Sequence, residues 1–293
     1  MHLVTRAISV AAFISIAALL TGGWVAFPRV GRPPGGVLSR YDLGRPPADR
    51  WELPHQLTEI SGLAMDSAGH LFAHGDERAE IFEIDPDGQR ILARFSFGEP
   101  AIQGDFEGIA VAGDRIFLVT SDGVLYAGRP GANGEHVQFV TYATGLGKFC
   151  EIESLAYDAA NPSLLLGCKE PRSSQLRHRL AIYRWSIDRR ALFPKPAILM
   201  SLAPITGPIG EKSFHPSDLT IDAATGHLLV LAGRQAAIAE MTSSGEVVKV
   251  ARLQRRLHPQ AEGIAITRAG SLVIADEGGR KRGTLTTYDR VRE

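Results

Sequence analysis

The chain has few cysteines and no excess of charge of either sign, and these two features limit the metal sites and the partners that can be expected. Its 293 residues include two cysteines, and Lys+Arg (32) balances Asp+Glu (32). Two cysteines cannot form a structural zinc site without ligands from elsewhere, because such a site takes four. The balanced charge gives no sign of nucleic acid or another polyanion as a partner. The composition is otherwise that of an ordinary globular protein.

Several short catalytic motifs are also missing. No serine stands in a Gly-x-Ser-x-Gly elbow, and the sequence has neither a phosphate-binding glycine loop nor the helix motif of zinc proteases. The sequence therefore leaves open whether the protein is an enzyme.

One long uncharged run stands near the N-terminus, over residues 7–27. About 20 apolar residues span a bilayer as a helix, and Trp24 and Phe27 lie where an interfacial aromatic is expected. The run predicts a transmembrane anchor over residues 1–28, followed by a Pro/Gly/Arg-rich linker over residues 29–36. A cleaved signal peptide is the alternative, because Thr21 and Gly22 are small enough for a processing site.

A phrase of eight residues recurs five times in the rest of the chain. The copies cover residues 59–66, 105–112, 151–158, 215–222 and 260–267, at steps of 46, 46, 64 and 45 residues. A period of about 40–50 residues built from short strands is typical of a β-propeller. We therefore predict an all-β propeller over residues 37–293, with five blades of four antiparallel strands. The longer third step, residues 170–214, predicts a long loop, with remnants of a sixth blade as the alternative.

The last blade ends too soon to contain an outer strand of its own. Residues 37–43 alternate as a strand should. We expect this N-terminal strand to complete the last blade and close the ring, so that no sheet edge stays exposed. Residues near Tyr41 should then pair with the end of the chain.

The two cysteines flank one hairpin. Cys150 immediately precedes the third copy, and Cys168 lies in the strand that follows it. A turn at Asn161-Pro162 would bring them together, one or two residues out of register. A disulfide is then reasonable in an oxidising compartment, and two separate buried thiols are the alternative.

Acidic residues gather at the starts of the repeated phrases. In a propeller the innermost strands line a central channel, and because neighbouring strands are antiparallel, the start of each first strand and the end of each second strand share one face. Such an acidic ring is unfavourable unless a cation compensates it, and an all-oxygen set suits calcium. The expected metal ligands are Glu107, Glu153, Glu262 and Asp218. The further ligand-binding candidates are Glu59, Asp76, Asp122, Lys169, Glu170, Arg234, Asp276 and Glu277.

Two alternatives to a metal site stay open for these residues. Carboxylates at repeated positions can simply accept hydrogen bonds from backbone amides of the next blade. Asp218 or His215 could also serve as a general base, although most lone histidines are not catalytic.

Several of these stretches resemble one protein family. They are residues 107–110, 153–157, 168–171, 227–231 and 260–265, followed by Leu-Val-Ile-Ala-Asp-Glu at 272–277. They resemble the SdiA-regulated (YjiK-like) family of bacterial propeller proteins, from about Glu59 to Tyr288. The resemblance implies a membrane-anchored or exported propeller, associated with calcium and without a settled activity. Ser154 replaces the family's glycine and Arg234 its usual acidic residue, which counts against a complete acidic ring.

Three functions are consistent with this reading. The first is a binding protein with a calcium-like cation at the channel mouth, single-pass in the bacterial inner membrane and facing the periplasm, or secreted there after signal cleavage. The second is a calcium-dependent hydrolase, because the Glu-Gly pairs at 107–108 and 262–263 are also similar to those of propeller lactonases and phosphotriesterases. The third is a protein-interaction platform on the basic segment 172–179. The expected partners are the membrane, through the N-terminal helix, and a small molecule or protein, but not nucleic acid.

Overall fold

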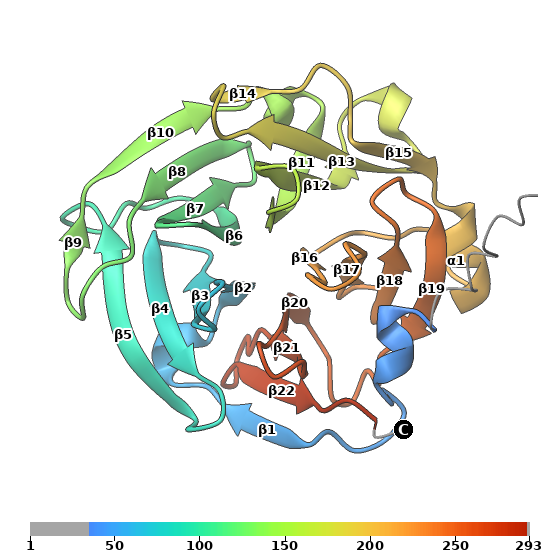
Figure 1. Ribbon diagram of the computed structural model, residues 1–293, viewed down its shortest axis with the longest axis horizontal. Coiled ribbons are helices and arrows are strands. Elements are labelled where there is room, and N and C mark those ends of the chain that lie inside the picture. Colours follow the sequence, from blue (N-terminus) through green and yellow to red (C-terminus); the bar gives the residue numbers. More distant parts are fainter. Residues whose placement is uncertain (1–34, 292–293) are drawn as a thin grey trace, which may run out of the picture. The chain divides into compact units, whose positions relative to one another are not determined.

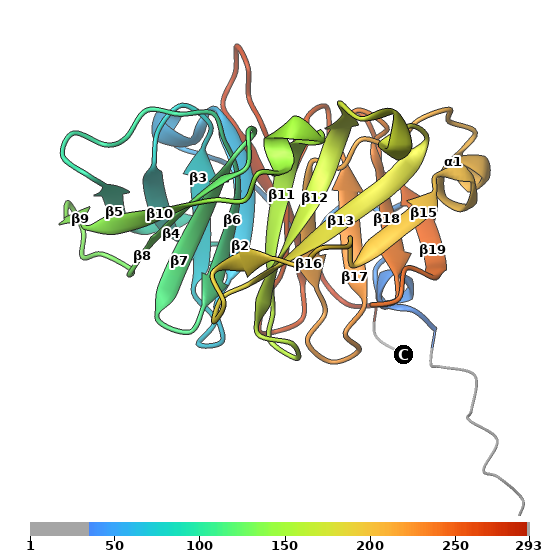
Figure 2. The same cartoon turned by 90° about the horizontal axis from the view of Figure 1, so that it is seen from above.

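The computed structural model describes residues 35–291, which form five blades around a common centre (Figure 1). Each blade is a sheet of four or five strands, so the predicted five-bladed, all-β propeller is confirmed. Seen from the side, the strands run between the two faces of the ring (Figure 2).

The blades follow the order of the chain, and each begins with its innermost strand. The first contains β2 (Ile60–Met65), β3 (Leu71–Gly75), β4 (Glu80–Asp85) and β5 (Arg90–Phe97). The second contains β6 (Phe106–Ala112), β7 (Arg115–Thr120), β8 (Val124–Gly128) and β10 (Phe139–Ala143). From this blade, the short strand β9 (His136–Val137) crosses over and pairs parallel with β5, which ties the second blade to the first.

The remaining blades repeat the pattern. The third contains β11 (Cys150–Asp158), β12 (Ser163–Pro171) and β13 (Arg179–Ser186), with β14 (Ala191–Leu192) and β15 (Ile198–Ser201) both paired to β13. The fourth contains β16 (Asp218–Ile221), β17 (Leu228–Ala232), β18 (Ala237–Met241) and β19 (Val247–Arg252). The fifth contains β20 (Ala261–Ile266), β21 (Leu272–Asp276), β22 (Thr284–Tyr288) and β1 (Asp49–Glu52).

Helices are short and lie outside the sheets. They are the 3₁₀ turns η1 (Val37–Arg40), η2 (His55–Leu57), η3 (Leu146–Lys148) and η4 (Ser174–Leu176), and the α-helix α1 (Ala203–Ile209).

The hydrophobic core lies between neighbouring blades, not inside one sheet. Each of five clusters joins side chains from two adjacent blades. Middle strands are therefore buried on both faces, which explains why β17 is a continuous apolar run, Leu-Leu-Val-Leu-Ala, with every residue buried. Sheet stacking of this kind fixes the inner strands around the axis, where the candidate site lies.

The closure of the ring is N-terminal, but it uses a different strand from the one predicted. The outer strand of the fifth blade is β1, in which Arg50 pairs with Thr286. Val37 and Leu38 instead begin η1, because their backbone amides donate to the two carboxylate oxygens of Glu240, at 2.7 and 2.9 Å. Their side chains are buried in the cluster between the fourth and fifth blades. The ends still meet, since the Val291 amide donates to the Arg40 carbonyl at 2.8 Å.

The expectation of a long loop over residues 170–214 was wrong in part. The segment contains β13, β14, β15 and α1, so it completes the third blade. Leu176, within the basic stretch 172–179, is buried against this blade.

The predicted anchor at residues 1–28 and most of the linker at 29–36 lie outside the described residues. Within residues 35–291, no helix combines the length and apolarity that crossing a membrane requires.

Candidate functional site

The repeated phrase divides the propeller axis into layers. Side chains from the third position of the phrase line a pocket at the start of the inner strands. Side chains from the fifth and seventh positions line a second pocket toward the strand ends. One sequence pattern thus builds two sites of different chemistry on opposite faces of the ring.

The first pocket, here called the acidic pocket, has a volume of about 120 Å³. Seven residues predicted from the sequence to converge do line it, together with Ile60 and Ser61. The seven are Glu59, Asp76, Glu107, Glu153, Lys169, Glu262 and Glu277.

Two contacts organise the acidic pocket. Lys169 Nζ lies 2.5 Å from Glu153 Oε2, and the two side chains are only 15% and 4% exposed. The Ser61 hydroxyl donates to Glu107 Oε2 at 3.1 Å. The pocket therefore contains six carboxyl groups and a single lysine, so one ammonium group cannot neutralise all of the carboxylates.

The pKa values of these carboxyl groups are raised as a result. Burial and the neighbouring Glu153 raise the pKa of Glu107 to about 9. Burial, only partly offset by Lys169, raises the pKa of Glu153 to about 8. Burial and the adjacent Glu59 carboxyl raise the pKa of Glu277 to about 7. At neutral pH the pocket therefore holds protons that exposed carboxylates would have released.

Lys169 shows the opposite response to the same surroundings. Burial alone lowers the pKa of this ammonium, but Glu153 and Glu262 outweigh burial and raise the pKa. Lys169 is therefore charged, and it acts as a cation already bound among the carboxylates.

Asp218 lies outside the lining of the acidic pocket and is 1% exposed. Its carboxylate accepts hydrogen bonds from the backbone amides of Ile264 at 2.8 Å, Leu219 at 2.8 Å and Leu63 at 3.4 Å. These contacts join the fourth, fifth and first blades. The structural alternative, a carboxylate that accepts backbone amides, therefore describes Asp218.

The position of Asp218 in the phrase explains this role. Three other copies have glycine there, and at Gly108 an added Cβ would lie 2.8 Å from the Leu155 amide nitrogen of the next blade. Neighbouring inner strands approach too closely for most side chains. In the fourth blade the carboxylate reaches across the gap instead.

The other predicted residues form contacts of their own beside the pocket. Glu170 Oε1 lies 2.8 Å from His215 Nδ1 and accepts a hydrogen bond from Arg234 at 2.7 Å. Asp276 is buried against His258 Nδ1 at 2.8 Å. Asp122 accepts a hydrogen bond from the Thr120 hydroxyl at 2.5 Å. None of these side chains lines the acidic pocket.

The described residues contain no group of three or more His, Cys, Asp or Glu side chains placed to hold a metal ion. Two of the four expected ligands have other partners, since Asp218 accepts backbone amides and Glu153 binds Lys169. Of the calcium set predicted from Glu107, Glu153, Glu262 and Asp218, the three glutamates line the acidic pocket and Asp218 does not.

Comparison with known proteins places the chain in a family. The sequence model of the SdiA-regulated family matches residues 49–280, most of the described propeller. The chain belongs to the SdiA-regulated family. The match begins at β1, the strand that closes the ring.

Solved structures confirm the fold of this SdiA-regulated protein. Glutaminyl cyclase from Myxococcus xanthus is similar with a TM-score of 0.56 and 14% identity, over 84% of this chain and 97% of that one. The PQQ-bound aldose sugar dehydrogenase from Streptomyces coelicolor is similar with a TM-score of 0.53 and 13% identity, over 83% and 99%. A luciferin-regenerating enzyme is similar with a TM-score of 0.53 and 11% identity, over 82% of this chain and 95% of that one. At such low identity these similarities concern the fold alone.

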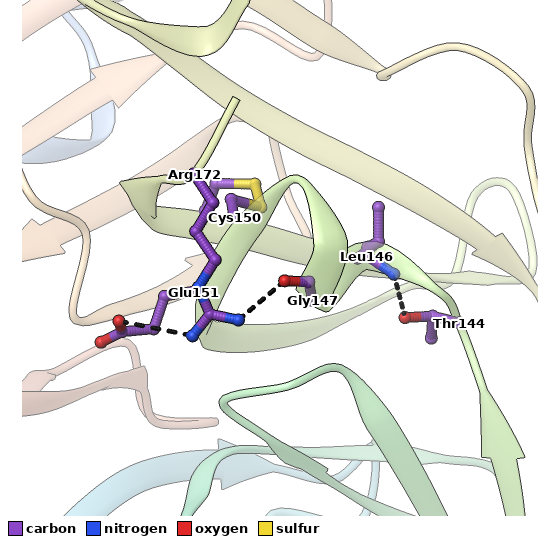
Figure 3. Close-up of a disulfide and its surroundings, with 7 residues drawn as sticks. Thr144, Leu146, Gly147, Cys150, Glu151 and Arg172 are labelled. Carbon is purple, nitrogen blue, oxygen red and sulfur yellow. Dashed lines mark hydrogen bonds and ion pairs between the residues drawn. A yellow bond between two sulfur atoms is a disulfide. The ribbon is translucent and has the colours of Figure 1, made fainter. Parts of the chain in front are cut away.

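A disulfide joins Cys150 to Cys168 beside the third inner strand, with the two Cα atoms 5.7 Å apart (Figure 3). Cys168 pairs in register with Ile152, so the cysteines are two residues out of register. Across the same corner, Arg172 donates to the Gly147 carbonyl at 2.7 Å and lies 3.8 Å from Glu151 (Figure 3). These contacts hold the loop around η3 to the start of β11, close to Glu153.

Sequence reasoning missed the serines of the site. Ser61 donates to Glu107, and Ser217 donates to the carbonyl of Ala261, the residue directly before Glu262, at 2.8 Å. Both serines occupy the third position of the phrase, the position of the pocket glutamates. The alignment of the five copies therefore contained the signal.

Proposed function

We propose that this SdiA-regulated propeller is a binding protein that takes a small organic ammonium ion into the acidic pocket. The observation that supports this is the position of Lys169, whose ammonium group lies 2.5 Å from Glu153 in the pocket. The pocket thus already accommodates one ammonium ion, and five further carboxyl groups line it.

Electrostatics favour a second cation in this pocket. Burial and the repulsion of neighbouring carboxyl groups raise the pKa values of Glu107, Glu262 and Asp76. A cation that enters the pocket relieves this repulsion and releases protons. A volume of about 120 Å³ admits only a small group, such as the end of an alkylamine.

Calcium stays a prediction from the sequence, and it is a competing ligand here. The oxygen donors suit it chemically, but among residues 35–291 no three acidic or histidine side chains are placed to hold a metal. Calcium binding would require the carboxylates to reorient, whereas an ammonium ion binds individual carboxylates by directional hydrogen bonds. The hydrolase hypothesis depends on this calcium site and is tested with it.

The disulfide supports an extracytoplasmic location. Disulfides persist in oxidising compartments such as the bacterial periplasm and are rare in the cytosol, and Cys150 and Cys168 form one here. Export to the periplasm is therefore part of the proposal.

The binding proposal is tested by titrating the full-length protein with ethylammonium chloride, and separately with calcium chloride, at constant ionic strength by calorimetry. Titration in two buffers of different ionisation enthalpy gives the number of protons released. We expect ethylammonium binding with net proton release at pH 7, weakened roughly tenfold by Glu262→Gln, which removes one charged acceptor. Glu246→Gln, an exposed carboxylate of the hairpin before β19, is the matched control.

The results separate the hypotheses. Calcium binding without ethylammonium binding would replace this proposal by the metal site predicted from the sequence. No binding of either ion, or equal ethylammonium affinity in the Glu262→Gln variant, would overturn the proposal.

A further inference from the structure

The second pocket on the axis has a volume of about 470 Å³ and lies at the far end of the inner strands. We call it the apolar cup. Four fifth-position residues form its floor: Leu63, Ile109, Leu155 and Leu219. The seventh position of all five copies forms its wall: Met65, Val111, Tyr157, Ile221 and Ile266.

The wall of the apolar cup differs from the floor in its burial. The floor residues are buried, whereas Met65, Tyr157, Ile221 and Ile266 are only partly buried. The wall side chains therefore line an accessible hollow and also pack against the clusters between the blades. The volume falls in the range of about 300–1,000 Å³ that is usual for small-molecule sites.

Two arginines stand at the rim of the apolar cup. Arg268 donates to the Ala68 carbonyl at 3.1 Å, and Arg290 donates to the Gly270 carbonyl at 3.1 Å. Neither arginine has a carboxylate within ion-pair distance among residues 35–291. Both therefore keep donors available for an anion.

The acidic residues at the rim are already engaged. Asp66 accepts from the backbone amide of His70 at 2.8 Å and lies 2.8 Å from the imidazole of the same residue. Asp222 accepts from Arg40 at 3.2 Å and from the Thr225 hydroxyl at 2.7 Å. Asp222 is paired with Arg40, so Asp66 is the carboxylate that remains beside Arg268 and Arg290 in the lining. The net charge of this mouth is therefore positive, the reverse of the acidic pocket.

We propose that the apolar cup binds a small amphipathic carboxylate, with its apolar body against the seventh-position wall and its carboxylate at Arg268 and Arg290. Burial of an apolar body supplies most of the affinity, and charge-assisted hydrogen bonds from guanidinium groups orient the head. This site is on the opposite face from the acidic pocket and does not depend on the function proposed there.

The test uses two probes with the same apolar body, 4-phenylbutyrate and 4-phenyl-1-butanol, titrated calorimetrically into the full-length protein. We expect the carboxylate to bind roughly tenfold more tightly than the alcohol, as one good charge-assisted contact predicts. Replacing both arginines (Arg268→Gln with Arg290→Gln) should remove that difference and leave the alcohol unchanged. Arg280→Gln, in the exposed loop before β22, is the matched control.

A second variant tests the wall independently of charge. Ile221→Trp fills the cup and should weaken both probes, while Glu107→Gln in the acidic pocket should weaken neither. Equal affinity for the two probes, or unchanged binding in the double arginine variant or in Ile221→Trp, would overturn the proposal. Loss of ethylammonium binding with the carboxylate site intact would refute only the acidic-pocket function.

Discussion

Lys169 Nζ and Glu153 Oε2 lie 2.5 Å apart on adjacent strands at the start of the third blade. Lys169 comes from the end of β12 and Glu153 from the start of β11. Antiparallel pairing therefore brings the only pocket lysine to the most buried pocket glutamate. Because the other carboxyl groups surround this pair, its charge balance affects both the stability of the fold and the chemistry of the site.

Lys169→Met tests this charge balance. The variant leaves Glu153 buried without a counter-charge, so we expect the free energy of unfolding at pH 8 to fall by about 1–3 kcal/mol. At pH 5 the loss should be smaller, because the pKa of Glu153 is raised to about 8 and the group is then neutral. Urea unfolding at the two pH values measures the difference.

The double variant Lys169→Met with Glu153→Gln is the control for that experiment. Removing both charges should recover most of the lost stability, since the coupling between two contacting residues appears as non-additivity. Equal destabilisation by Lys169→Met at both pH values would contradict a charge-based role.

Stability should also depend on pH through Glu107. Its pKa is raised from 4.5 to about 9 in the folded protein, so between these pH values the folded state holds a proton that the unfolded chain has released. Stability therefore falls as pH rises across this range. We expect the loss between pH 5 and pH 8 to be at least roughly 2 kcal/mol, or about 4 °C or more in Tm.

Glu107→Gln isolates this effect in a thermal unfolding series. The amide mimics the protonated carboxyl group, so the variant should be more stable than the parent at pH 8 and similar to it at pH 5. Glu246→Gln should follow the parent at every pH. A Glu107→Gln variant with the same difference in Tm from the parent at pH 5 and at pH 8 would contradict a raised pKa of Glu107.

Much of the acidic pocket was predictable because the repeated phrase occupies the equivalent inner strand of every blade. Glu107, Glu153 and Glu262 occupy the same position of three copies, and in a propeller equal positions of the inner strands meet at the axis. Lys169 followed from antiparallel pairing with the next strand. Neither inference required knowledge of the packing between blades.

The predictions that were wrong concerned residues whose positions depend on contacts between distant parts of the sequence. Asp218 occupies the glycine position of its copy, and its role became clear only from the distance to Ile264 in the next blade. Residues 37–43 alternate like a strand. The backbone amides of Val37 and Leu38 instead donate to Glu240, about 200 residues away, and the segment begins a 3₁₀ turn. Alternation over seven residues cannot identify a partner so distant in sequence.

Asp218→Ala should destabilise the fold through unsatisfied amides. The variant leaves the buried Ile264 N–H and Leu219 N–H without acceptors, at a cost of about 1–3 kcal/mol each. Asp218→Asn should cost less, because its carbonyl oxygen can still accept a hydrogen bond. Urea midpoints measure both variants. A nearly neutral Asp218→Ala with an altered ligand affinity would instead favour a binding role for Asp218.

Removal of the disulfide should loosen one corner of the acidic pocket. Cys150 and Cys168 are 18 residues apart, and a loop of this size corresponds to about 3 kcal/mol of stability in the chain-entropy account. The variant Cys150→Ala with Cys168→Ala should lose about that amount in urea unfolding. A reductant should shift the parent protein equally and leave the variant unchanged. Hydrogen exchange should increase most in residues 144–151, which the disulfide and Arg172 hold together. An increase spread evenly over all five blades would show that the disulfide stabilises the whole ring rather than this corner.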